Sequence, residues 1–115
     1  MTGKILIAAI GLLHIYILIV EMFLWNKKTG MRMFHIDREF ADKTRVLAAN
    51  QGLYNGFLAA GLLLSLAFSV TPGIYFFLCC VMAAGVFGAF TAGRRILYVQ
   101  ALPALAAVIL FSLKI

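Results

Sequence analysis

The chain has 115 residues, of which 64% are hydrophobic and only 12% are charged, and its formal net charge is +6. Ordinary soluble domains are roughly half apolar, so this composition excludes a typical soluble domain and indicates an integral membrane protein.

Four apolar runs are long enough to cross a bilayer, whose hydrocarbon core needs about 20 helical residues. They cover residues 5–25, 46–70, 73–93 and 96–113. None of them alternates apolar and polar residues as the strands of a membrane barrel do. The sequence therefore predicts one all-α domain over residues 1–115, an integral membrane four-helix bundle.

The first run contains Glu21, the only acid in any of the four runs. Lys4 precedes this run as in a signal peptide, but the run is too long and no small-residue cleavage pattern follows it, so we expect a retained span. Intramembrane acids are costly and usually face a bundle interior or a water-filled cavity. His14 lies on the same helix face, two turns or roughly 10 Å away along the axis. Glu21 and His14 are thus candidate acid/base groups.

The segment between the first two runs is polar and basic. Met33, Ile36 and Phe40 recur in it at helical spacing, which predicts a short amphipathic helix on the membrane surface. His35 and Glu39 are four residues apart, so they would be able to share a metal ion on one helix face. We favour a solvated charged face instead, and we expect neither a metal nor a cofactor.

The second run begins with the polar stretch Asn50-Gln51-Gly52-Leu53-Tyr54-Asn55-Gly56. At about 100° per residue, its polar side chains fall within one broad arc, and Gly52 and Gly56 fall on the adjoining face. Ridges of small residues let another helix approach closely, and the third run has two more, through Gly85 and Gly88. These four glycines predict close helix packing and permit a homodimer.

The last two runs contain three residues that need comment. Cys79 and Cys80 are adjacent, and neighbouring cysteines rarely have disulfide geometry, so both are expected to be small apolar residues in a helix. Pro103 frees the carbonyl of Val99 from its helical hydrogen bond, and we expect a tolerated kink there.

Basic residues predict the orientation of the chain, because short loops rich in Lys and Arg stay in the cytoplasm. Segment 26–45 carries six Lys and Arg residues and connection 94–95 carries two, and four spans place both on one side. We therefore expect a multi-pass protein of the inner membrane, with both termini outside and both basic segments in the cytoplasm. The partners expected are the bilayer and its anionic headgroups rather than nucleic acid, since no basic and aromatic residues interleave. The headgroups are expected near Lys27, Lys28, Arg32, Arg94 and Arg95.

With this orientation every span places hydrogen-bonding groups near the cytoplasmic side, and His14 lies deeper, near the midplane. The convergence predicts a polar intramembrane site. Its candidate ligand-binding residues are Glu21, His14, Asn50, Gln51, Tyr54, Asn55, Thr91 and Gln100. The alternative is that these groups only hold the bundle together, at about 0.6 kcal/mol for each interhelical hydrogen bond.

Several stretches resemble a known family. They are residues 14–16, 21–25, 50–61, 84–91 and 100–104. They resemble the bacterial family of small four-helix membrane proteins catalogued as domain of unknown function thirteen-oh-four. The resemblance covers all four spans and implies the same fold and the same Glu, Asn, Gln and Thr positions, but no activity. Members usually have glycine after the glutamine of the last motif, where this chain has Ala101.

We expect a protein that binds or transports a small cationic or protonatable ligand, with Glu21 as counter-ion and proton site. One alternative is a membrane-embedded enzyme that acts on a lipid-like substrate, with Glu21 as acid/base and Asn55, Gln51 and Tyr54 orienting the substrate. Hydrolysis is disfavoured because no nucleophile with a base is evident. The other alternative is a structural or accessory membrane subunit.

Overall fold

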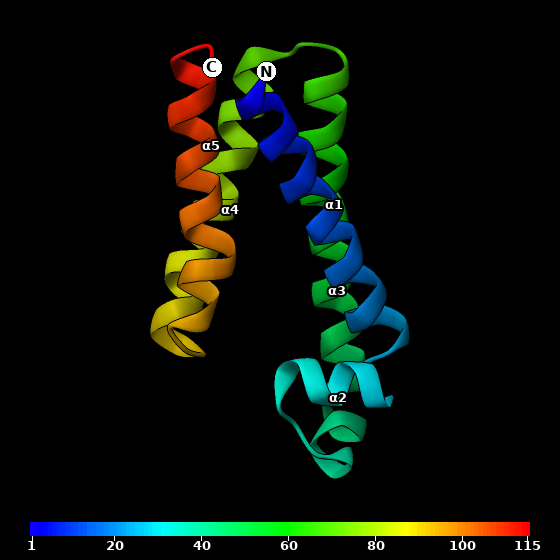
Figure 1. The fold of residues 1–115 in the computed structure, drawn as a ribbon. Helices are drawn as coiled ribbons and strands as arrows, with labels where there is room; N and C mark the ends of the chain where they lie inside the picture. Colours follow the sequence, from blue (N-terminus) through cyan, green and yellow to red (C-terminus); the bar gives the residue numbers. More distant parts are fainter. The chain divides into compact units, whose positions relative to one another are not determined.

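The computed structural model describes residues 1–115. The chain is all-α, as predicted, and has no strands. Its elements in chain order are α1 (Thr2–Phe23), α2 (Lys28–Phe34), α3 (Arg38–Ala67), α4 (Thr71–Thr91), the π-helical turn η1 (Leu97–Ala101) and α5 (Leu102–Ser112) (Figure 1). They form two compact units: the terminal unit, residues 1–12 and 58–115, and the central unit, residues 13–57.

The terminal unit has an apolar core to which four helical segments contribute. The buried core residues are Ile7, Ile10, Leu62, Ile74, Leu78, Val81, Ala104 and Ala107. They come from the start of α1, the end of α3, α4 and α5. The helices α4 and α5 run side by side (Figure 1), and a methyl group on Gly85 would come within 2.7 Å of the backbone nitrogen of Ala101. Small residues therefore allow α4 to approach the backbone at Ala101 closely.

The central unit consists of the second half of α1, the short helix α2 and the first half of α3. Trp25, just after α1, donates a hydrogen bond from Nε1 to Oγ1 of Thr44 on α3, at 3.0 Å. Its ring also packs on Phe34 of α2, with ring centroids 4.9 Å apart. Trp25 thus connects all three helical segments of this unit.

The amphipathic helix expected around Met33, Ile36 and Phe40 is not a single helix. Met33 lies in α2, Phe40 lies in α3, and Ile36 lies between them. The break has two local causes. His35 adopts a left-handed conformation with φ 56°, which ends α2, and the Asp37 carboxylate accepts a hydrogen bond from the backbone N–H of Phe40 at 2.8 Å. Asp37 therefore caps α3, which continues without interruption into the expected second span.

The kink expected at Pro103 takes the form of a π-helical turn. Pro103 lies in the first turn of α5, and it has no N–H to continue the hydrogen bonds of the helical turn before it. Just before it, the backbone N–H of Leu102 bonds to the carbonyl of Leu97, five residues back. The wider turn accommodates a proline ring that would otherwise clash with the carbonyl of Val99.

Two helices, α1 and α4, are long and apolar enough to cross a membrane. The expected second span is the later part of α3, whose polar residues from Asn50 to Asn55 lower its hydropathy. The expected fourth span corresponds to an apolar helix, Leu97–Ser112, that is shorter than the other two. By length and composition, the structure thus supports the first and third of the four expected spans.

Candidate functional site

A hydrogen bond between Glu21 and Asn55 is the main polar contact in the central unit. Asn55 donates from Nδ2 to Oε1 of Glu21 at 2.6 Å. Glu21, in the last turn of α1, is only 3% exposed. The same Asn55 nitrogen also donates to the backbone carbonyl of Gln51 at 3.2 Å, which orients the amide. Because Asn55 is uncharged, it satisfies one carboxylate oxygen without supplying positive charge.

Glycines on α3 let the Glu21 segment approach. A methyl group on Gly52 would lie 3.1 Å from Cβ of Glu21 and 3.2 Å from the backbone oxygen of Leu18. A methyl group on Gly56 would lie 2.5 Å from Cδ1 of Leu18. The ridge of small residues therefore allows close packing, as its spacing predicts. The helix that packs against it is α1 of the same chain.

The homodimer expected through Gly52, Gly56, Gly85 and Gly88 is not tested by one chain and stays a prediction. Each of the four glycines has a neighbour within its own chain: α1 for the first two, Ala101 for Gly85 and Ile96 for Gly88. The close packing that motivated the expectation is thus used inside the protomer.

The structure brings only Asn55 of the four predicted polar side chains of α3 to Glu21. Asn50, Gln51 and Tyr54 are exposed, and the Tyr54 ring packs on Phe57 with centroids 5.9 Å apart. The reason is helical geometry. At about 100° per residue, Tyr54 points about 100° away from Asn55. Four side chains spread over so wide an arc of α3 cannot all face Glu21.

The other predicted site residues lie in different surroundings. His14, two turns before Glu21 on α1, is 1% exposed. In the terminal unit, Thr91 donates to the carbonyl of Phe87 in its own helix at 2.9 Å, and Gln100 lies half-buried in η1. A shared layer of Glu21, Thr91 and Gln100 stays a prediction.

The structure contains no group of three or more His, Cys, Asp and Glu side chains that would hold a metal ion. His35 and Glu39, the pair considered from the sequence, are on different elements, since His35 ends α2 and Glu39 lies in the first turn of α3. Glu39 instead pairs with Lys43, 3.2 Å away on an exposed face. The favoured expectation of a solvated charged face fits this geometry.

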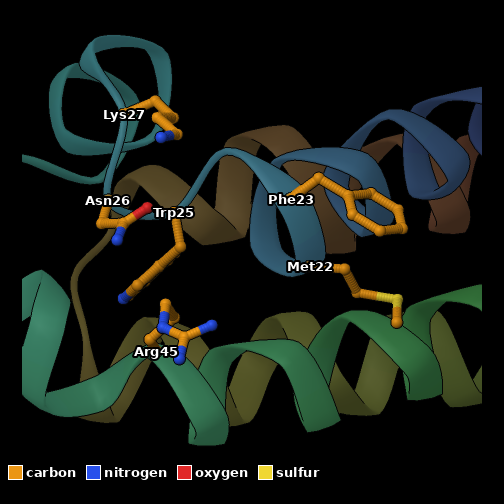
Figure 2. A pocket seen from close by; sticks show the side chains of 6 residues that line it. All are labelled: Met22, Phe23, Trp25, Asn26, Lys27 and Arg45. Carbon is orange, nitrogen blue, oxygen red and sulfur yellow. The ribbon is translucent and has the colours of Figure 1, made fainter.

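A second feature, not singled out from the sequence, is a pocket of about 260 Å³ at the end of α1 (Figure 2). Its lining residues are Met22, Phe23, Trp25, Asn26, Lys27 and Arg45. The sequence held a signal for it: Trp25 ends an apolar run, and two basic residues follow after Asn26. The contribution of Arg45 had no such signal, because it depends on how α3 packs beside α1.

Comparison with known proteins gives a family without an assigned activity. Residues 8–112 match the sequence model described as "Protein of unknown function (DUF1304)". The chain is also similar to "Uncharacterized protein YpaA" of Lactococcus lactis subsp. lactis (strain IL1403), with 29% identity over 100 residues that cover 84% of each chain. No solved structure matches. Since the family match runs from the first helix to the end of α5, it confirms the resemblance seen in the sequence, and the chain belongs to the DUF1304 family.

Proposed function

We propose that this chain is a four-span inner-membrane protein that binds a small cationic or protonatable ligand at Glu21, with both termini outside. The observation that carries the proposal is the buried carboxylate of Glu21, which accepts a hydrogen bond from neutral Asn55. Carriage of the ligand across the membrane, coupled to a proton on Glu21, is the transport form of the same proposal.

Exposed apolar side chains support the membrane location. On α4, Phe76, Phe87 and Phe90 are 62%, 70% and 87% exposed. Soluble monomers rarely expose contiguous apolar patches of more than a few hundred Å², whereas lipid tails are as apolar as these side chains. The two helices of sufficient length and hydropathy and the basic segments between the expected spans point the same way.

The chemistry of Glu21 supports a positively charged ligand. A buried carboxylate keeps its charge only with compensation from hydrogen bonds or an opposite charge. Asn55 supplies the hydrogen bond. A cationic ligand would supply the charge, and in its absence a proton would neutralise the carboxyl, so ligand and proton would compete for one group.

The two alternatives receive different support. For an enzyme with Glu21 as acid/base, Asn55 remains available to orient a substrate, but Gln51 and Tyr54 have exposed side chains. For a structural subunit, the bond between Glu21 and Asn55 would serve only to hold α1 to α3. The charge of Glu21 separates these functions, because assembly through a hydrogen bond does not require it.

The replacement Glu21→Gln tests the proposal. Glutamine keeps the shape and still accepts the Asn55 hydrogen bond, but it removes the charge. We expect Tm in detergent to stay the same or rise, since a costly buried charge is gone. We expect the rise in Tm caused by lipophilic cations such as tetraphenylphosphonium to disappear; a ligand at 100 times its Kd stabilises by about 2.7 kcal/mol.

Glu39→Gln is the matched control, because it makes the same chemical change at an exposed site. The charged-site proposal fails if these cations raise the Tm of the Glu21→Gln variant as much as they raise the Tm of the unsubstituted protein and of the control. Native mass spectrometry of gently purified protein would identify a retained ligand. Flux in proteoliposomes would then indicate transport, and conversion of an extracted lipid would indicate an enzyme.

A further inference from the structure

The pocket at the end of α1 brings together residues from three positions in the central unit. Met22 and Phe23 end α1, Trp25 to Lys27 form the turn after it, and Arg45 comes from α3 (Figure 2). Its volume of about 260 Å³ lies just below the range of roughly 300–1,000 Å³ for sites that enclose drug-sized ligands. The size suits a headgroup rather than a whole large molecule.

Two positive charges line this pocket. Lys27 and Arg45 are far apart in sequence, and the two carboxylates nearest to them in sequence on α3 have partners of their own. Asp42 accepts a hydrogen bond from Nδ2 of Asn26 at 3.2 Å, and Glu39 pairs with Lys43. Two cationic side chains around a small open pocket favour an anion, and the guanidinium of Arg45 matches the oxygens of a phosphate group.

The wall between the two cations is held in place. Trp25 donates to Oγ1 of Thr44, which in turn donates to the carbonyl of Phe40 at 2.7 Å. Thr44 directly precedes Arg45, so these bonds fix the α3 backbone beside the pocket relative to the turn after α1. In Figure 2 the side chain of Trp25 extends toward α3, where Arg45 lies.

The remaining lining consists of Asn26 and two apolar side chains, Met22 and Phe23. Met22 lies against Gly52 of α3, and Phe23 is 63% exposed. A freely soluble anion would gain nothing from contact with these apolar side chains, whereas an amphiphile would place its acyl chains along them. Tryptophan with a lysine close to it in sequence is also typical of the level at which headgroups lie.

We propose that this pocket binds a phosphate group through Lys27 and Arg45, with the apolar part of the same ligand along Met22 and Phe23. The ligand class is an anionic phospholipid. This goes beyond general attraction of basic residues to the bilayer, because it separates Lys27 and Arg45 from Lys28 and Arg32, which are also exposed. It is also independent of ligand binding at Glu21.

The test compares two double variants of the full-length protein in detergent. Lys27→Gln with Arg45→Gln removes both pocket charges, and Lys28→Gln with Arg32→Gln removes two charges outside the pocket. Binding is followed as the rise in Tm with short-chain phosphatidylglycerol, short-chain phosphatidylcholine and inorganic phosphate. We expect phosphatidylglycerol to bind about tenfold more weakly to the pocket variant, the effect of losing two exposed charge contacts, and unchanged to the control variant.

The arms with different ligands identify the source of the phosphate. A rise in Tm with phosphatidylglycerol but not with inorganic phosphate supports the phospholipid. An equal rise in Tm with inorganic phosphate would support a phosphate site but overturn the phospholipid as its ligand. Equal weakening in both double variants, or no rise with any of the three, overturns the proposed site.

A measurement on the unsubstituted protein avoids dependence on the folding of variants. Acetylation of lysines is followed by mass spectrometry with and without phosphatidylglycerol. We expect the lipid to slow acetylation of Lys27 severalfold while that of Lys28, its neighbour in the chain, stays nearly unchanged. Equal protection of the two lysines, or protection of neither, would contradict the proposal.

Discussion

The carboxylate of Glu21 is buried beside the amide of Asn55, and this contact defines the chemistry of the central unit. The 2.6 Å hydrogen bond joins residues on different helices, and glycine at position 52 makes room for it. Spacing along α1 placed Glu21 on a face with His14, but it did not identify Asn55 among four polar neighbours. Only the packing of α1 on α3 makes that choice.

Gly30 is the glycine of the central unit at which an added methyl group would meet rigid backbone atoms most closely. A methyl group there would lie 2.7 Å from the carbonyl oxygen of Trp25 and closer still to that of Leu24. We expect Gly30→Ala to destabilise the protein by about 1–3 kcal/mol, since rigid backbone atoms must move. Thermal unfolding in detergent measures this, and hydrogen exchange should show faster opening of α2.

The neighbouring exposed residue provides the control for Gly30→Ala. Thr29→Ala changes the same short helix without placing a new atom against the end of α1. If the two variants unfold at the same temperature, the close approach of α2 to the Leu24 and Trp25 carbonyls does not limit stability, and the prediction is wrong.

At the scale of the elements, two local signals set the helix boundaries that hydrophobic periodicity missed. Asp37 caps α3 through the N–H of Phe40, and Pro103 follows a π-helical turn. The cap residue was visible in the sequence, since an aspartate before a helix is a common start signal. Periodicity alone extended one amphipathic helix across it because Met33, Ile36 and Phe40 keep helical spacing through the break.

The contact between α4 and the η1–α5 segment depends on Gly85 more than on Gly88. A methyl group on Gly85 would meet backbone and Cβ atoms of Ala101 at 2.7–3.0 Å, whereas one on Gly88 would meet the side chain of Ile96 at 3.0 Å or more. We expect Gly85→Ala to lower the free energy of unfolding by about 1–3 kcal/mol. Far-UV circular dichroism during denaturation in detergent measures it.

Gly88→Ala serves as the matched comparison on the same helix. The Ile96 side chain is able to move, and alanine gains about 1 kcal/mol of helix propensity over glycine, so the net change should be small. Equal destabilisation by both substitutions would mean that the backbone approach at Ala101 does not limit this contact.

At the scale of the whole molecule, the basic segments predict the orientation of the chain in the membrane. We expect a cysteine at position 32, introduced by Arg32→Cys after replacing Cys79 and Cys80 by alanine, to react with a membrane-impermeant maleimide only in permeabilised cells. A cysteine introduced by Thr71→Cys should react in intact cells. The reverse pattern would overturn the orientation with both termini outside.

The sequence by itself determined the all-α class, the family and the unusual burial of an acid in α1. Each of these depends on composition, on motifs or on the order of residues along one helix, which require no knowledge of packing. The four-span arrangement remains a prediction, because α3 carries a polar stretch and the last helix is short. The shared polar layer also remains a prediction.

The tertiary structure decided which groups meet. It paired Glu21 with Asn55, left Asn50, Gln51 and Tyr54 exposed, and placed Arg45 beside Trp25 and Lys27. The physical reason is that contacts between helices depend on their relative rotation and closeness. These follow from where glycine allows backbones to approach and from which side chains lock them, as Trp25 does through Thr44.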